Sequence, residues 1–374
     1  MPPSKKVKLS KGSAAPTPEP VAIKESIDEP SPSTSPDSEP MTSFIATVGS
    51  YERLLYGLKA EWAETTTESP TDRPALKVSL IFGFPAHGNS ITAVASTRTH
   101  LVTGSVDENI NLFNTKRLKE IGSLLQHNGT ITALRFFSKT HMISASEDQT
   151  IRVWRTKDWE CLTVFKGHKD RVNDVAVHPT GRLAMSVSKD RTLRLWNLLT
   201  GRKASVNKIY KEGLAVQWDT SGKRYVVLSE REITIYNVAD ASVLHNIPLT
   251  KRIHCIYPLV DPNDPDTEYL LCGGDDKRIH IYDMSTGKLR ASPICHEARV
   301  RALQVISLEH PTADKKSPTP IVTSISTDGK VKFWDFNDLL ADDQATGETT
   351  STSEPPTPLA NYTTGCRLTC LALS

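Results

Sequence analysis

Histidine, serine and aspartate recur along this chain at fixed spacings, and these are the residue types of a hydrolytic triad. In the clearest set, His168, Ser186 and Asp190 are joined by Trp196, with the serine four residues before the aspartate and the tryptophan six after it. A buried hydroxyl, imidazole and carboxylate can activate a nucleophile, or they can simply satisfy one another's hydrogen bonds. The chain has no G-x-S-x-G nucleophile elbow, and each set recurs in register with an aromatic residue. The pattern therefore predicts structural networks, and we predict no catalytic residue and no enzyme.

The same frame repeats along the chain. Asp107, Asp148 and Asp190 are spaced by 41 and 42 residues, and a looser version of the frame ends at Tyr282. The predicted network residues are His87, Thr103 and Asp107; His127, Ser144, Asp148 and Trp154; His168, Ser186, Asp190 and Trp196; and His296, Ser324, Asp328 and Trp334. A period of about 40 to 45 residues is typical of a propeller blade of four strands.

The elements that must position these residues are short strands. Within 167–201, apolar and polar residues alternate over 172–177, 183–187 and 192–196, and turn-forming residues separate these runs. Such alternation indicates half-buried strands. Gly167-His168 and Trp334-Asp335 match the two signature dipeptides of WD repeats, so the chain is identified as a WD-repeat protein. The predicted fold class is all-β, a seven-bladed WD-repeat β-propeller.

The two ends of the chain are predicted to share blade 1. Residues 43–85 contain three strand patterns without a first one, and 366–373 match 170–177 position by position. Blade 1 would thus combine 43–85 with 365–374, within a propeller that spans 43–374. Closing the ring in this way removes an unpaired strand edge. Four long insertions, at 63–75, 261–267, 307–319 and 338–358, fall between first and second or third and fourth strands, so we expect them on one face.

Composition excludes several classes of protein. With 38% apolar and 24% charged residues, the chain has no run near the ~20 apolar residues that a spanning helix requires, so we predict no membrane association. The six cysteines show no C-x-x-C pair, which favours free thiols over a metal site. No Walker-type loop is present, and we predict no cofactor, metal or small-molecule substrate.

Residues 1–40 differ from the rest. They are rich in Pro, Ser and Glu and almost lack aromatics, so we predict a disordered tail. Lys5, Lys6 and Lys8 are typical of a nuclear-import signal, although such runs also occur as plain solvated tail.

Basic residues precede several predicted first strands. The arginines at this position are Arg171, Arg252, Arg299 and Arg367, with Lys169 and Lys251 close by. Because first strands line a propeller's channel, these residues should gather at its rim, where guanidinium groups could bind phosphates or carboxylates of a partner. The alternative is that each arginine is a solvated loop charge or pairs with a neighbour such as Asp170 or Glu297.

Three stretches resemble one family in particular. The chain resembles the p21-activated-kinase-interacting protein family, whose fungal members are the maintenance-of-killer WD-repeat proteins. The similar stretches are 44–58, with the sequence FIATVGSYERLLYGL, 181–198 and 366–372. The resemblance covers about 43–373. It also implies a lysine-rich C-terminal tail, whereas this chain ends at Ser374 just after the closing strand.

The resemblance implies a non-enzymatic scaffold in nucleolar assembly of the large (60S) ribosomal subunit. Its partners would be the pre-60S particle, with its assembly factors, ribosomal proteins and ribosomal RNA, and its location the nucleus and nucleolus. Two other readings stay open. One is a negative regulator that binds p21-activated kinase; the other is a different binding module, such as a ubiquitin-ligase substrate receptor or a chromatin reader.

Overall fold

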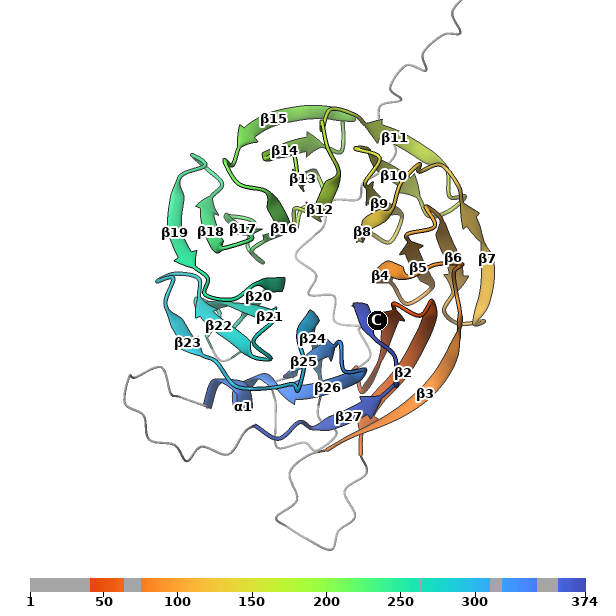
Figure 1. Ribbon diagram of the computed structural model, residues 1–374, viewed down its shortest axis with the longest axis vertical. Coiled ribbons are helices and arrows are strands. Elements are labelled where there is room, and N and C mark those ends of the chain that lie inside the picture. Colours follow the sequence, from red (N-terminus) through yellow and green to blue (C-terminus); the bar gives the residue numbers. More distant parts are fainter. Residues whose placement is uncertain (1–40, 64–74, 263, 310–317, 342–355) are drawn as a thin grey trace, which may run out of the picture.

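The computed structural model describes residues 41–63, 75–262, 264–309, 318–341 and 356–374. The nuclear-import tract at Lys5, Lys6 and Lys8 and the rest of 1–40 lie outside the described residues, so the division into tail and propeller stays a prediction. The described strands form seven four-stranded antiparallel sheets arranged around a central channel (Figure 1). This confirms the predicted β-propeller.

Each sheet is one blade, and its four strands are named below in order from the channel to the outer rim. Blade 1 consists of β28 (Leu368–Leu373), β1 (Ser43–Ser50), β2 (Leu54–Trp62) and β3 (Leu76–Pro85); blade 2 of β4 (Ile91–Ser96), β5 (His100–Ser105), β6 (Ile110–Asn114) and β7 (Lys119–Leu124); blade 3 of β8 (Ile131–Ser138), β9 (His141–Ser146), β10 (Ile151–Arg155) and β11 (Cys161–Phe165); and blade 4 of β12 (Val172–Val177), β13 (Leu183–Ser188), β14 (Thr192–Asn197) and β15 (Arg202–Lys208).

Three further blades complete the ring. Blade 5 consists of β16 (Gly213–Trp218), β17 (Arg224–Ser229), β18 (Glu232–Asn237) and β19 (Val243–Pro248); blade 6 of β20 (Ile253–Val260), β21 (Glu268–Gly274), β22 (Ile279–Asp283) and β23 (Leu289–Ala291); and blade 7 of β24 (Val300–Leu308), β25 (Thr319–Ser326), β26 (Lys330–Asp335) and β27 (Ala360–Thr363). The helix α1 (Phe336–Ala341) follows β26, and no helix in the described part of the chain is long and apolar enough to cross a membrane.

The ring closes as the sequence predicts. β28 pairs antiparallel with β1, with Ala46 opposite Leu373 and Val48 opposite Leu371. On its other side β28 lies beside β4 and β24, the innermost strands of blades 2 and 7. The last strand of the chain therefore supplies the innermost strand of the first blade, and β1 is paired on both sides instead of forming the edge of its sheet.

Apolar side chains between neighbouring sheets form the core. The second strands of the blades are buried along most of their length, as in β9 and β13, and the sheets are joined by large side chains such as Trp196. The Trp196 ring lies 4.8 Å from the ring of Phe165 in the preceding blade, centroid to centroid. Successive residues of a strand point to opposite faces of its sheet, and both faces of blade 4 pack against a neighbouring blade, with Val172 and Trp196 on one side and Val187 and Leu193 on the other.

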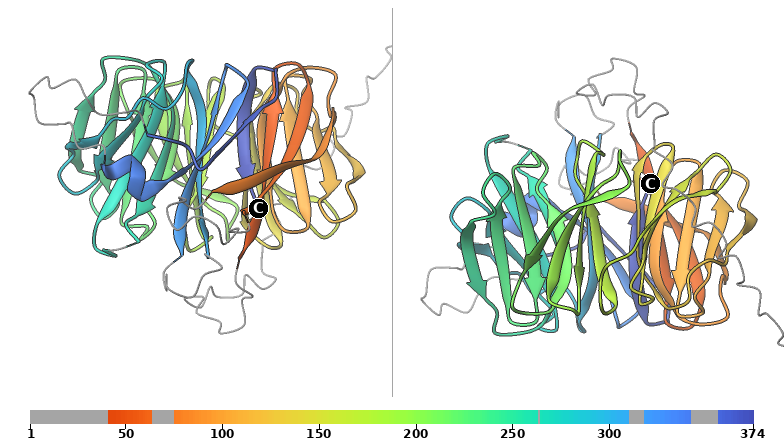
Figure 2. Two further views of the ribbon diagram at one scale, coloured as in Figure 1. Left: turned by 90° about the horizontal axis from the view of Figure 1, so that it is seen from below. Right: turned by 90° about the horizontal axis from the view of Figure 1, so that it is seen from above.

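The described strand ends that flank the long insertions lie on one side of the disc. Strand ends flanking three of them contact one another: the Trp62 indole donates to the carbonyl of Glu309 at 3.0 Å, and the Leu76 amide donates to the carbonyl of Leu359 at 3.2 Å. Figure 2 shows β2 and β24 ending on this same side. The opposite side, which carries the Gly-His loops and the turns between second and third strands, is called the Gly-His face below.

Candidate interaction surface at the channel mouth

The repeated histidine, serine and aspartate are brought together in blade 4. The two ring nitrogens of His168 lie 2.9 Å from a carboxylate oxygen of Asp190 and 2.8 Å from the hydroxyl of Ser186. The Trp196 indole donates to the same hydroxyl at 2.8 Å. The set therefore ties the loop before the first strand to the second and third strands of its own blade.

Asp190 also shapes the turn in which it lies. One of its oxygens accepts from the Thr192 amide at 2.9 Å, and the next residue, Arg191, has a left-handed φ of 59°. The same two features recur after Asp107, Asp148 and Asp276, where residues with φ between 69° and 70° follow the aspartate. A side chain that bonds its own backbone two residues ahead stabilises such a turn.

Burial decides that these sets are structural. Ser144, Ser186 and Ser324 are 0% exposed, so no substrate can reach their hydroxyls. Burial lowers the pKa of His168, which favours its neutral form. Burial would raise the pKa of Asp190, but hydrogen bonds from Thr192, the Lys169 amide and His168 outweigh it and hold that pKa at about 2. A neutral imidazole beside an ionised carboxylate gives both groups a hydrogen-bond partner, and the histidine does not have to be charged in a buried position.

The network varies from blade to blade. Blade 3 repeats blade 4, with 2.8 Å from His127 to both Asp148 and Ser144 and 2.8 Å from the Trp154 indole to Ser144. In blade 2, His87 contacts Thr103 at 2.8 Å and Asp107 at 3.1 Å, and no indole completes the set.

Blade 7 departs from the predicted network. His296 contacts Ser324 at 2.7 Å, and the Trp334 indole donates to Ser324 at 2.8 Å, but His296 Nδ1 lies 3.9 Å from Asp328. That distance is too long for a hydrogen bond, so the fourfold network predicted here is incomplete.

Blade 6 builds the contact from another strand, which sequence reasoning missed. His280 in β22 reaches back to Asp276 at 2.5 Å and forms a second contact with the Ser292 hydroxyl at 2.8 Å. The signal was present in the sequence as a histidine four residues after the aspartate, but it falls outside the repeating frame.

The predicted rim arginines do lie around the channel mouth on the Gly-His face. They belong to a set of seven residues that we call the outer ring. Each of these residues immediately precedes the innermost strand of one blade. The ring consists of Arg367, Ser90, Thr130, Arg171, Glu212, Arg252 and Arg299, from blade 1 to blade 7. Lys169 and Lys251 are exposed in the same loops.

The rim arginines differ in their partners, and the two neighbours considered from sequence are not among them. Arg171 lies 3.3 Å from Glu212 and 3.6 Å from Glu147, and Arg299 lies 3.8 Å from Asp275. Glu297 instead pairs with Lys330. Within the described ranges, no carboxylate lies at ion-pair distance from the guanidinium of Arg252 or Arg367.

An inner ring, the second residue of each innermost strand, lies one step deeper in the channel. It consists of Thr369, Thr92, Thr132, Asn173, Leu214, His254 and Arg301, from blade 1 to blade 7. Three members donate a hydrogen bond to the carbonyl of the residue that begins the next blade's innermost strand: Thr369 to Ile91, Thr92 to Ile131, and Asn173 to Gly213. These bonds join neighbouring blades at the channel wall.

The inner ring is different at blades 5 to 7. Arg301 donates to His254 Nδ1 at 3.3 Å, and His254 Nε2 lies 2.7 Å from Asp275. An imidazole that accepts at Nδ1 donates from Nε2, so His254 is neutral in this arrangement. Burial lowers the pKa of His254, with a further contribution from Arg301, which agrees with that tautomer. Arg301 and His254 were not predicted as site residues, because each occurs once and belongs to no repeat.

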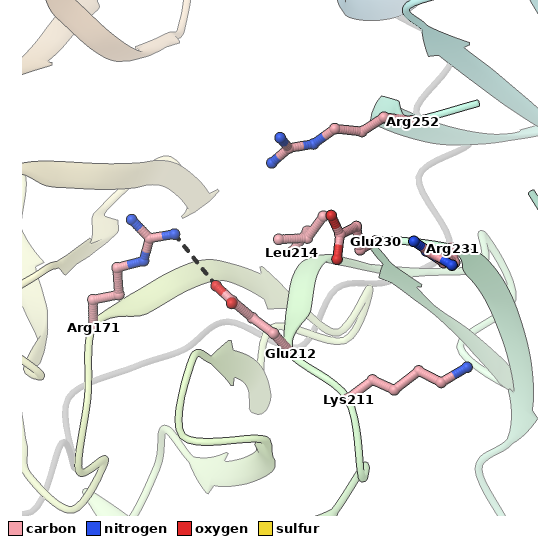
Figure 3. Close-up of a pocket in the computed structure, with 7 residues that line it drawn as sticks. All are labelled: Arg171, Lys211, Glu212, Leu214, Glu230, Arg231 and Arg252. Carbon is pink, nitrogen blue, oxygen red and sulfur yellow. Dashed lines mark hydrogen bonds and ion pairs between the residues drawn. The ribbon is translucent and has the colours of Figure 1, made fainter.

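Two cavities meet at this part of the mouth. A pocket of about 380 Å³ is lined by Arg171, Lys211, Glu212, Leu214, Glu230, Arg231 and Arg252, and a channel cavity of about 440 Å³ also includes Leu214, His254 and Arg301 in its wall. In Figure 3 the guanidinium groups of Arg171 and Arg252 point into the same opening from opposite sides. Among the described residues no group of three His, Cys, Asp or Glu side chains could hold a metal ion. The surface suits the recognition of charged groups.

Comparison with known proteins agrees with the fold. The sequence model of the WD domain, G-beta repeat, matches residues 78–114, 118–155, 159–197 and 245–283. Each match begins in or next to the outermost strand of one blade and ends with the third strand of the next blade. The last match does so for blades 5 and 6.

Three curated relatives are similar over most of their length. The chain is 35% identical to p21-activated protein kinase-interacting protein 1-like of Danio rerio over 326 residues, which cover 87% of this chain and 79% of the relative. It is 34% identical to p21-activated protein kinase-interacting protein 1 of Homo sapiens over 325 residues, covering 87% and 76%. It is 33% identical to Protein MAK11 of Saccharomyces cerevisiae over an alignment of 370 residues, covering 88% and 83%.

Proposed function

Because the chain belongs to the WD-repeat family of p21-activated protein kinase-interacting protein 1 and MAK11, we propose that it is a non-enzymatic scaffold in nucleolar assembly of the large ribosomal subunit. In this role it would act during processing of precursor ribosomal RNA within the pre-60S particle. The observation that carries the proposal is the similarity to MAK11 along most of both chains. It is supported by the resemblance of 44–58, 181–198 and 366–372 to the p21-activated-kinase-interacting and maintenance-of-killer family, which implies this role.

The site supports a scaffold rather than a catalyst. The recurring serine, histidine and aspartate side chains hydrogen-bond one another inside the blades, as His168, Ser186 and Asp190 do in blade 4. What the molecule offers to solvent is a rigid disc with a charged channel mouth, which is a surface for binding. Lys5, Lys6 and Lys8 support a nuclear and nucleolar location.

Depletion of the protein in its own cells tests the proposal. On sucrose gradients, mature large subunits should fall while small subunits stay near normal, and re-expression of the full chain should restore the balance. A profile in which both subunits stay balanced after depletion would contradict the proposal.

A second candidate is supported by the names of the relatives in Danio rerio and Homo sapiens, which describe kinase-interacting proteins. In this function the chain would bind a p21-activated kinase and restrain it. A purified kinase regulatory domain would then bind the chain directly, and the protein would remain largely outside pre-ribosomal fractions. The two candidates are separated by which fractions contain the protein.

A further inference from the structure

The two sides of the channel mouth are joined by different sets of hydrogen bonds. At blades 1, 2 and 4 the inner ring is neutral, and Thr369, Thr92 and Asn173 each bond the next blade. At blades 5 to 7 the same positions hold Leu214, His254 and Arg301. These side chains line the same channel cavity, but among the described residues none of them donates to the carbonyl that begins the next innermost strand. The seven positions are equivalent by the symmetry of the fold, so the difference is chemical and local.

Arg301 is a charge without a direct carboxylate partner at this mouth, among the residues that the structure describes. Its guanidinium is partly buried, and its side-chain hydrogen-bond partner within the described part of the chain is the neutral His254 at 3.3 Å. Burial lowers the pKa of Arg301, and repulsion from Arg299 and Arg252 adds to that effect. Asp275, on the other side of His254, offsets part of this repulsion. A guanidinium partly withdrawn from water would gain further from a direct pair with a carboxylate of a ligand.

We propose that the mouth of the channel between blades 5 and 7 binds an acidic peptide segment of a partner protein, with Arg252 and Arg301 pairing with its carboxylates. Arg252 extends into the adjoining pocket without an ion-pair partner among the described residues (Figure 3). The planar fork of an arginine matches a carboxylate with two parallel hydrogen bonds. Leu214 lines both the pocket and the channel cavity, and an apolar side chain of the peptide can pack against it.

The surroundings favour a peptide over a nucleic acid. Binding to single-stranded RNA uses an extended basic groove that follows several phosphates, with aromatic side chains for the bases. Here Arg252 and Arg301 lie in one sector with Glu212, Glu230 and Asp275 among them, so the basic surface is too short to follow several phosphates. Arg301 is also recessed behind the outer ring, within reach of a single side chain rather than of a chain of phosphates.

This inference deepens the proposed scaffold function, on which it rests for its biological setting, by naming the surface and the chemistry of its partner. The two can fail separately. Subunit profiles after depletion test the role in ribosome assembly, whereas peptide binding by the purified chain tests the surface.

The test begins with a random-peptide display library panned against the purified full chain. Enriched peptides should carry aspartate or glutamate beside apolar residues. With one labelled enriched peptide, fluorescence anisotropy should show weakening of about tenfold for Arg301→Met and about fivefold for Arg252→Ala, because each removes one charged pair from a partly desolvated site. Arg252→Ala removes an exposed side chain and keeps the test valid even if Arg301→Met folds poorly.

Two controls complete the experiment. Arg117→Ala removes an exposed arginine between β6 and β7 on the opposite face and should leave peptide affinity unchanged. A labelled single-stranded oligouridine should bind wild type and both variants equally. The proposal is overturned if enriched peptides are not acidic, if none is enriched, if both variants bind the peptide normally, or if the variants weaken oligouridine instead.

Discussion

Blade 4 and blade 5 share the same four-stranded plan but are held in place from opposite faces. In blade 4 the contacts lie on the Gly-His face, where His168, Ser186, Asp190 and Trp196 bond one another. Blade 5 has no such set. The position of Ser186, the fourth residue of the second strand, is taken by Val227, and that of Trp196 is taken by Tyr236, which stacks on Tyr225 at 4.9 Å between ring centroids.

Blade 5 is secured on the other face by its neighbours. Arg224 donates to Glu268 of blade 6 at 2.7 Å and lies 3.4 Å from Asp219 in its own blade. The other oxygen of Glu268 accepts from the amide and hydroxyl of Thr220 at 2.8 and 2.7 Å. On the side of blade 4, the Trp218 indole donates to the carbonyl of Ala176.

The comparison teaches that a blade can lose its repeat signature and keep its fold. Blade 4 satisfies its buried polar groups within one repeat, whereas blade 5 depends on residues of the adjacent repeats. The channel mouth follows the same division, because the neutral inner ring ends at Asn173 and the arginine-rich sector begins beyond it.

The largest expected effect is on the blade 5 side. Arg224→Ala would leave Glu268 and Asp219, whose side chains are 6% and 0% exposed, without their cation. Removing one partner of a buried ion pair costs about 3 kcal/mol of unfolding free energy. Guanidinium denaturation measures the loss. Lys223→Ala, an exposed neighbour, should change stability by less than about 0.5 kcal/mol. Equal effects of the two variants would mean that the contacts of Arg224 with Glu268 and Asp219 do not stabilise blade 5.

A smaller effect is expected from the network of blade 4. Ser186→Ala removes the hydroxyl that contacts His168 and Trp196, and an unsatisfied buried polar group costs about 2 kcal/mol. Ser123→Ala, on the exposed outer strand β7, is the matched control and should be close to neutral. If both serine variants unfold at the same denaturant concentration as wild type, the network does not stabilise blade 4.

The smallest effect is a dependence on pH that blade 4 has and blade 5 lacks. The pKa of His168 is lowered from its usual value near 6.5 and that of Asp190 is lowered to about 2, so the folded state binds fewer protons than the unfolded state. The contribution of His168 is therefore complete above about pH 6.5 and is lost as the pH falls below it, whereas that of Asp190 is lost only between about pH 4 and pH 2.

Unfolding free energies measured from pH 7.5 to pH 5 should thus decline less steeply for His168→Leu than for wild type, by at most about 1.4 kcal/mol per pH unit. Tyr236→Phe in blade 5 changes no group that titrates in this range and should retain the wild-type slope. Parallel curves for wild type and His168→Leu would show that the histidine does not link folding to protons.

Much of the fold could be predicted because each blade repeats a local pattern. Alternation over 172–177 and the spacing of Ser186, Asp190 and Trp196 lie within one blade, so they are visible in a short window of sequence. The pairing of β28 with β1 was predictable too, since 366–373 repeat the pattern of a first strand. The blade 7 network was predicted in full but is incomplete, because spacing fixes which residues meet and does not fix a distance such as the 3.9 Å from His296 to Asp328.

The number of blades, their strand order, the closing strand and the arginines of the outer ring could all be inferred from the repeats in the sequence. The tertiary structure alone decided which charges are paired, because partners such as Arg224 and Glu268 are 44 residues apart and meet only when two blades stand side by side. It also decided that Arg301 faces the channel beside a neutral histidine. Repetition encodes what one blade does within itself; the contacts between blades exist only once the ring has closed.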